Sequence, residues 1–325
     1  MKPCWHLAVC FVAAAAFAGS SPAARADDYP NHPIHLIVGF GPGSSADITA
    51  RVLGAHMSRT LGQQIVVETR PGAGSTLAAE FVVRSPKDGY TLFLGSAASV
   101  INGAIKPLPF DFAKDLAPIA LATQTPNILV VPPSLGMNSV KELIALAKAR
   151  PGELVFGSSG VGTSPHVSGE LFNIMAGVKV LHVPYQGSAQ AMTDLLAGRL
   201  SMMFSPASTV VPHIQSGAVK ALAATTLKRA AIAPDLPTVD EAGLPGFDTS
   251  IWFGLNAPAG TPREIIDKLS RAANEALRAP DVKATLLKQA LEPMGGTPDD
   301  YARYTVTETK KWTEVARAAG MTPSQ

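Results

Sequence analysis

Short apolar runs alternate with amphipathic stretches along most of the chain. The runs that predict strands each end in a turn containing Gly, Ser or Pro, and they lie at 34–40, 64–69, 90–95, 127–132, 153–158, 179–185, 200–205 and 219–225. The stretches with helical spacing lie at 45–61, 74–84, 139–149, 165–176, 188–197, 263–278, 280–291 and 298–319. Strands that alternate with helices predict βαβ units, so we expect an α/β fold of mostly parallel sheets flanked by helices.

The N-terminal segment has the layout of a secretory signal peptide. A lysine precedes an apolar stretch at 7–19, and an Ala-Arg-Ala cleavage signal follows at 24–26. The apolar stretch is shorter than the roughly 18 residues that a membrane span needs. We therefore expect residues 1–26 to be removed on export to the periplasm. Cys4 and Cys10 lie in this segment, so the exported chain must be stable without disulfides.

Composition and charge limit the classes of partner. The sequence has 325 residues, and a chain of about this length suggests two domains of ordinary size. Without Lys2 and Arg25 the 27 basic residues become 25, equal to the 25 acidic ones, and no stretch concentrates Lys and Arg. A neutral chain without a basic cluster argues against nucleic acid or an anionic membrane as the partner.

One strand-to-helix turn has the spacing of a dinucleotide-binding fingerprint. In VGFGPGSSADITARVL (38–53), Gly41, Gly43 and Ala46 satisfy G-x-G-x-x-A, and Glu68 ends the next apolar run. Nicotinamide cofactors are cytoplasmic metabolites, so the export signal argues against a Rossmann-type oxidoreductase. That function remains a distant alternative, because it rests on the fingerprint alone.

The same layout returns in the second half of the chain. ELVFGSSGVGTSPHVSGELF (153–172) again places a Gly/Ser turn between a strand and a helix, with Thr163 or Ser164 as N-cap and Pro165 at the first helical position. Unpaired N–H groups and the helix dipole suit such turns to anions, and ligands of open α/β sheets bind beside them. Two matched turns predict a clamp around an anion. The alternative is that the glycines only permit turns and the serines only cap helices.

Signatures of catalysis and of metal binding are missing from the sequence. There is no G-x-S-x-G elbow, Walker loop or H-E-x-x-H, and no carboxylate–histidine cluster completes a metal site beside His32 and His35. We therefore expect neither an enzyme nor a cofactor or metal. Asp47 would repel an anion, so we expect it to bond within its loop, to water or to a ligand ammonium. For His166 we favour contact with a ligand carboxylate over a hydrogen bond at its helix start.

The order of motifs resembles that of the Bug-type extracytoplasmic solute-binding proteins, the receptor components of tripartite tricarboxylate transporters. The matching segments cover about 29–321 and are GFGPGSSADITAR, ETRPGAGST, SPKDGYTLFLGS, KDLAPIAL, SSGVGTSPHVSGELF, HVPYQGSAQAMTDLLAGR, LPTVDEAGLPGF, WFGLNAPAGTP and the C-terminal KKW and AAGM. The chain departs from the family at Ser44 and Ala46, where a second glycine and a Ser or Thr are frequent, and at Phe110, where Tyr is common. Ala46 removes a hydroxyl from the first turn.

The resemblance implies a two-lobe type II periplasmic-binding-protein fold, or Venus flytrap, with a mostly parallel sheet flanked by helices in each lobe. We expect lobe 1 to comprise 27–124 with 227–325, and lobe 2 to comprise 125–226. Carried over by position, the family's ligand-binding residues are Ser44, Ser45, Ala46, Asp47, Ser96 and Ala97 in lobe 1, and Ser159, Gly160, Thr163, His166 and Ser205 in lobe 2.

The predicted protein is a monomeric periplasmic receptor that captures a small organic carboxylate between its lobes. It would deliver this ligand to the membrane permease of a tripartite tricarboxylate-type transporter. A sensor that presents its closed form to a membrane receptor kinase would have the same sequence features and remains an alternative. We expect neutral donors and two helix N-termini to hold the carboxylate, without an ion pair to Arg51 or Arg70.

Overall fold

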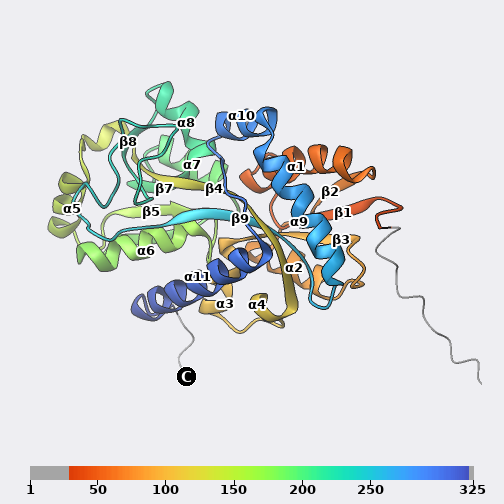
Figure 1. Cartoon of the computed structure of the whole chain (residues 1–325). Helices are drawn as coiled ribbons and strands as arrows, with labels where there is room; N and C mark the ends of the chain where they lie inside the picture. The colour runs from red at the N-terminus through yellow and green to blue at the C-terminus, as the bar shows by residue number, and fades with distance from the viewer. Residues whose placement is uncertain (1–28, 322–325) are drawn as a thin grey trace, which may run out of the picture.

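The computed structural model describes residues 29–321, and the predicted signal peptide at 1–26 lies outside them. Within the described residues, the strands form one mixed sheet in the order β2-β1-β3-β9-β4-β7-β5-β6, with β8 and β10 each paired to β4 (Figure 1). The strands are β1 (Ile34–Val38), β2 (Ile65–Thr69), β3 (Thr91–Ser96), β4 (Leu116–Val131), β5 (Val155–Ser158), β6 (Leu181–Pro184), β7 (Met202–Pro206), β8 (Lys220–Ala224), β9 (Ser250–Pro258) and β10 (Glu292–Pro293). The α-helices are α1 (Ser45–Leu61), α2 (Thr76–Val83), α3 (Ala97–Ile105), α4 (Phe112–Asp115), α5 (Val140–Ala149), α6 (Ser164–Ala176), α7 (Ser188–Leu196), α8 (Ala207–Gln215), α9 (Arg263–Arg278), α10 (Pro280–Lys288) and α11 (Pro298–Ala318).

The hydrophobic core divides the described chain into two halves. In the first half, two clusters join β1, β3 and β9 to α1–α3 and α9–α11. In the second half, two clusters join β5, β7 and β8 to α5–α8. The long strand β4 belongs to both, because Ile119 packs in the first half and Leu129 in the second. Figure 1 shows the two halves side by side, with β4 and β9 at the junction between them.

One buried carboxylate fastens the C-terminal helix α11 to the junction strand β9. Glu308 accepts hydrogen bonds from the indole nitrogens of Trp252, at 2.8 Å, and Trp312, at 2.9 Å. The Tyr301 hydroxyl of α11 also donates to Asn256 of β9, at 2.9 Å. Because α11 touches α6 as well as α3, it lies against both halves of the molecule.

The α/β architecture agrees with the sequence-based prediction, and all eight predicted strands and all eight predicted helices are present. Most have small shifts at their ends, but the strand predicted at 127–132 is the end of β4, which begins at Leu116. The pairing is more mixed than expected. Strands β1, β2 and β3 are parallel, as are β5, β6 and β7, but β4 and β9 pair antiparallel with their neighbours. The short strand β10 lies between α10 and α11, where no strand was predicted. Strand β9 and helices α3, α4 and α8 were not predicted.

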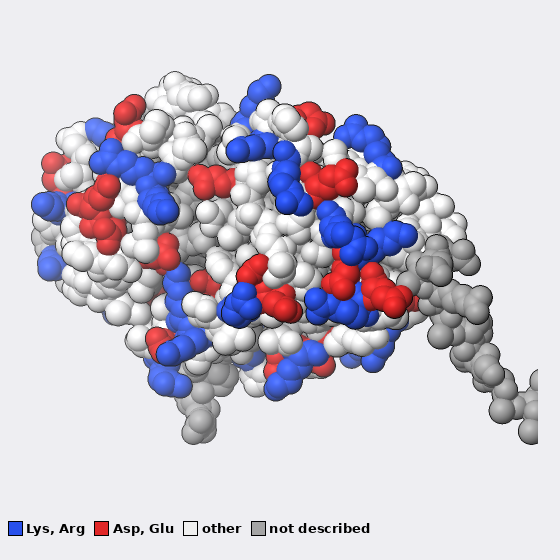
Figure 2. All heavy atoms as spheres, in the orientation of Figure 1, with Lys and Arg blue, Asp and Glu red and all other residues white. Residues whose placement is uncertain are grey.

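Charges of both signs are interspersed over the face of the molecule in Figure 2, without a large area of one sign. Many of the exposed charges pair locally, for example Arg263 with Asp267 and Arg303 with Asp300. This face therefore offers no basic patch of the kind that nucleic acids or anionic membranes bind. None of the described helices is long and apolar enough to span a membrane.

Candidate anion-binding site

A cavity of about 440 Å³ lies where the two halves meet. From the first half it is lined by the β1–α1 turn and by the start of α3. From the second half it is lined by the β5–α6 turn, the β6–α7 turn and the segment after β7. Ile251 and Phe253 of the junction strand β9 add an apolar wall. The cavity thus lies at the carboxyl ends of strands from both halves, where α/β proteins bind their ligands.

Five helices begin at this cavity. The first residues or N-caps of α1, α3, α6, α7 and α8 all line it, and each of these helices has nine or more residues. The first N–H groups of a helix have no partner within the helix, and the helix dipole gives that end a partial positive charge. Five such ends directed at one space favour an anion there.

The Ser96 hydroxyl provides a second, independent sign of a ligand. Ser96 is the N-cap of α3, it lines the cavity, and it is only 2% exposed. Its Oγ neither caps the helix nor has any other hydrogen-bond partner. Burying a hydroxyl without a partner costs about 1–3 kcal/mol. A ligand oxygen in the cavity would supply the missing partner once the hydroxyl, which is itself buried, turned towards the cavity.

No charged side chain lines the cavity among the residues that the structure describes. Asp47 accepts hydrogen bonds from the Gly43 N–H, at 2.9 Å, and from Arg51 Nε, at 2.8 Å. The carboxylate is therefore satisfied inside its own loop and helix, one of the roles predicted for it. Arg70 Nη2 lies 3.4 Å from Glu68 Oε2, and the Arg70 guanidinium lies over the ring of Phe81. Both arginines have partners outside the cavity.

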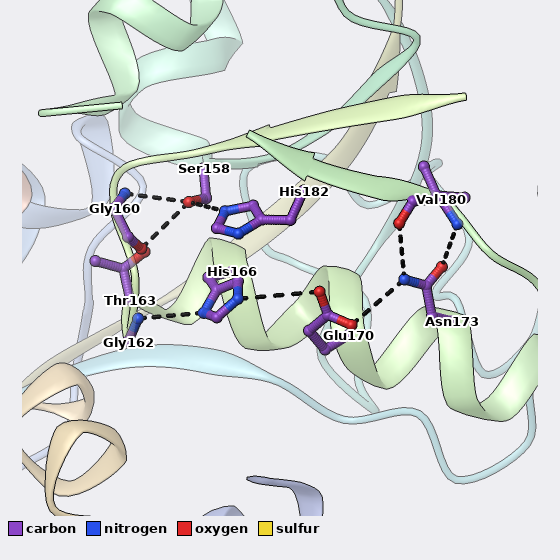
Figure 3. Close-up of polar contacts among 9 residues, drawn as sticks. All are labelled: Ser158, Gly160, Gly162, Thr163, His166, Glu170, Asn173, Val180 and His182. Atoms are coloured by element: carbon purple, nitrogen blue, oxygen red, sulfur yellow. Dashed lines mark hydrogen bonds and ion pairs between the residues drawn. The ribbon is translucent and has the colours of Figure 1, made fainter. Parts of the chain in front are cut away.

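Two stacked histidines, which do not line the cavity, form hydrogen bonds at the β5–α6 turn (Figure 3). The rings of His166 and His182 lie 4.0 Å apart. The Gly162 N–H donates to His166 Nδ1, at 3.2 Å, and His182 Nε2 lies 2.7 Å from Ser158 Oγ. Burial and the neighbouring His182 lower the pKa of His166 to about 3, and burial lowers the pKa of His182 to about 4. Both rings are therefore neutral at pH 7, and His166 can accept the Gly162 N–H.

A direct hydrogen bond joins the two halves at the cavity. The hydroxyls of Ser45, on α1, and Ser208, on α8, lie 2.6 Å apart. Ser45 is the first residue of α1, and Ser208 is the second residue of α8. The two helix N-termini therefore meet across the cavity, which indicates a conformation in which the halves are closed together.

Of the eleven predicted site residues, seven line the cavity and four do not. The residues that line it are Ser44, Ser45, Ala46, Ser96, Ala97, Ser159 and Thr163. Asp47, Gly160, His166 and Ser205 do not line it. His166 makes the helix-start hydrogen bond that was the alternative to ligand contact. Ser205 is fully buried in β7 with an unpartnered hydroxyl.

Two groups of lining residues were not predicted. The first, at 186–189, contains the N-terminus of α7, and the second is Ser208 and Thr209 of α8. Both groups follow a strand directly and contain Ser, Thr or Gly, the signal that singled out the other turns. The described residues contain no group of three or more His, Cys, Asp or Glu side chains that could hold a metal ion.

Comparisons with known proteins place this geometry in a family. Residues 49–321 match the model of the tripartite tricarboxylate transporter family receptor. Protein BugT of Bordetella pertussis is 37% identical over 308 residues, which cover 94% of each chain. The structure of R. palustris Rpa4515 with adipate superposes with a TM-score of 0.86 at 36% identity, covering 91% of this chain and 100% of that one. The periplasmic binding protein BugD gives a TM-score of 0.83 at 32% identity, covering 91% and 100%. The chain therefore belongs to the tripartite tricarboxylate transporter receptor family, the Bug-type extracytoplasmic solute-binding proteins.

Proposed function

We propose that this protein binds a small organic carboxylate in the cavity between its halves and delivers it to the permease of a tripartite tricarboxylate-type transporter. The observation that carries the proposal is the meeting of five helix N-termini at a cavity that no charged side chain of residues 29–321 lines. An adipate-bound relative with the same fold supports a dicarboxylate of similar length as the ligand. Family membership supports the permease as the partner and the periplasm as the compartment.

Neutral groups are sufficient to hold such a ligand. Each hydrogen bond to a charged group is worth about 1.5–3 kcal/mol, and each helix N-terminus adds about 0.3–1 kcal/mol. The unpartnered Ser96 hydroxyl and the hydroxyl of Ser159 are the side-chain donors that we assign to the carboxylate. A few such bonds, less the entropy of closure, correspond to micromolar affinity, about −8 kcal/mol.

We propose that the two halves separate to release the ligand, as the two lobes of a hinged clamp. The predicted boundaries, 27–124 with 227–325 for lobe 1 and 125–226 for lobe 2, stay a proposal. Core packing supports a return of the chain to lobe 1 after Phe247 rather than at 227, because Val239, Leu244 and Phe247 pack with the second half. The junction between the halves would then contain β4 and the start of β9.

The ligand class is tested by three molecules that share a six-carbon chain. Adipate carries two carboxylates, hexanoate carries one, and 1,6-hexanediol carries none. We expect the melting temperature to rise with adipate, to rise less with hexanoate, and not to change with hexanediol. Any molecule that binds the folded state stabilises it by mass action, and we expect binding here to require a carboxylate. A screen in which no mono-, di- or aromatic carboxylate raises the melting temperature, while another ligand class does, would contradict the proposal.

The absence of an ion pair leads to a second expectation. Arg51→Ala and Arg70→Ala should leave the dissociation constant for adipate within about threefold of the wild type, since both arginines have partners outside the cavity. Ser96→Ala and Ser159→Ala should each weaken binding about tenfold, which corresponds to about 1.4 kcal/mol. Isothermal titration calorimetry measures all four. Loss of binding in either arginine variant, with the fold retained, would show that the carboxylate needs a cation.

A further inference from the structure

The side chain of Asn102 lies buried between the two halves. Asn102 is on α3, whose N-terminus borders the cavity, and it is only 2% exposed. Its amide nitrogen donates to the carbonyl of Ala98 within the same helix, at 2.8 Å. The same nitrogen lies 3.4 Å from the Gly74 carbonyl of the first half and 3.5 Å from the Gly162 carbonyl of the second half. One amide group therefore contacts backbone from both halves.

Two glycines allow the backbone to approach the Asn102 amide this closely. Gly74 and Gly162 both have left-handed backbone conformations, with φ of 63° and 75°. A Cβ atom at Gly74 would lie 2.6 Å from the Asn102 amide nitrogen, and one at Gly162 would lie 2.5 Å from its amide oxygen. Neither position can carry a side chain while Asn102 stays in place. Asn102 thus packs tightly against both glycines, and its contact with Gly162 is lost when the halves separate.

Gly162 belongs to the turn that presents second-half residues to the cavity. Ser159 and Thr163, on either side of it, both line the cavity. The Gly162 N–H is held by His166 of the second half, and its carbonyl by Asn102 of the first half. The turn is therefore fastened to its own half on one side and to the opposite half on the other.

We propose that Asn102 is a positioning residue that fastens the β5–α6 turn to the first half and so stabilises the closed form of the clamp. It does not line the cavity, so it would act through Ser159 and Thr163 rather than by touching the ligand. Loss of its amide should speed opening and therefore ligand release. This inference rests on the proposed function in one respect, which is that closure retains a ligand.

Asn274 provides a matched control. Its amide nitrogen also donates to a carbonyl one helical turn back, that of Ser270, at 2.8 Å, and to the carbonyl of a loop glycine, Gly296, at 2.9 Å. All of these residues are in the first half, on α9 and the segment between β10 and α11. Its amide oxygen also accepts from the Gly296 N–H, at 2.9 Å. Asn274→Ala thus removes at least as many hydrogen bonds as Asn102→Ala without affecting contacts between the halves.

A ligand-free cross-linking experiment measures closure directly. The Ser45 and Ser208 hydroxyls are 2.6 Å apart, so Ser45→Cys with Ser208→Cys places two sulfurs within disulfide reach when the halves close. Cys4 and Cys10 lie in the predicted signal peptide, so the exported protein carries only the introduced pair. In this background we expect Asn102→Ala to slow disulfide formation at least fivefold, and Asn274→Ala to leave its rate unchanged.

A second substitution separates the contact between halves from the bond within the helix. Asn102→Ser retains a hydroxyl that can donate to the Ala98 carbonyl but is too short to reach Gly74 and Gly162. We expect it to slow cross-linking as much as Asn102→Ala while lowering the melting temperature less. If the Asn102 variants cross-link at the rate of the parent pair, or if Asn274→Ala slows cross-linking equally, the proposal is wrong.

Ligand release provides the second readout in proteins that keep Ser45 and Ser208. With adipate as the probe, stopped-flow measurements should show a dissociation rate at least fivefold higher for Asn102→Ala and unchanged for Asn274→Ala. If adipate binds the wild type but leaves Asn102→Ala at the wild-type rate, the proposal is contradicted even if cross-linking slows. If no carboxylate binds the wild type, the proposed function fails, while cross-linking still decides the role of Asn102.

Discussion

Ser45→Asp should abolish carboxylate binding, whereas Ser45→Asn should leave it measurable. Ser45 is the first residue of α1 and lines the cavity. An aspartate there favours the helix, because an anion at the N-terminus interacts well with the dipole. A ligand carboxylate about 4 Å away would meet a repulsion of about 4 kcal/mol at the effective dielectric of a protein surface. That energy corresponds to a loss of affinity of roughly a thousandfold.

The asparagine variant isolates the charge. Both substitutions replace the Ser45 hydroxyl that bonds Ser208 and add nearly the same volume, so the main difference between them is the negative charge. Calorimetry with adipate should show heat of binding for Ser45→Asn and none for Ser45→Asp, with both variants melting near the wild-type temperature. Equal affinity in the two variants would mean that no anion occupies this end of the cavity.

Stability should fall as the pH is lowered from 7 towards 4, and His166 and His182 should account for much of the fall. Their pKa values in the folded protein are about 3 and about 4, whereas an unfolded histidine has a pKa of about 6.5. Between these values the unfolded chain binds more protons than the folded one, so stability rises with pH. The contribution is complete above about pH 6.5 and is lost as pH falls, by up to about 1.4 kcal/mol per pH unit for each histidine.

The neighbouring Glu170 carboxyl also affects how stability depends on pH. Glu170 Oε1 lies 3.9 Å from His166 Nε2, and burial raises the pKa of Glu170. A raised carboxyl pKa stabilises the fold as pH falls, which opposes the histidines. The double variant His166→Asn with His182→Gln keeps Glu170 and retains amide groups near the Gly162 and Ser158 contacts. Urea titrations at pH 4.5 to 7 should show a flatter profile for this variant than for the wild type. Parallel profiles would rule out the two histidines as the cause.

The regular part of the fold was predictable because its signals are local. Helix α1 begins at Ser45 as expected, since Ser44 accepts a hydrogen bond from the Asp47 N–H and Gly62 ends the helix in the left-handed conformation. The elements that were missed depend on tertiary packing. Helix α8 carries Pro212 in its interior and α3 carries Gly103, and both residues disfavour helix. Strand β9 forms because β3 and β4 lie on its two sides.

The site was predictable to the same extent. The turns before α1 and α6 carry visible Gly/Ser patterns, and the structure places Ser44 and Thr163 at the cavity as their N-cap positions imply. Ser208 was missed because α8 itself was missed. His166 was placed in the cavity by sequence because it opens a helix, but the stacking of His182 turns its ring to the back of the β5–α6 turn. Such orientation depends on a contact between residues of two different elements, which spacing does not reveal.

The neutrality of the cavity wall has a consequence for how this protein and its relatives diverge. Backbone amides at five helix starts favour an anion, and these amides stay in place when a lining side chain is exchanged. Exchanges among the small lining residues, such as Ala46, Ala97 and Ser188, change the shape of the cavity without leaving a buried charge unpaired. A paired arginine and carboxylate would have to change together, because either one alone is costly in a buried place. Ligand preference in this architecture can therefore shift through single substitutions, each compatible with a folded and anion-binding intermediate.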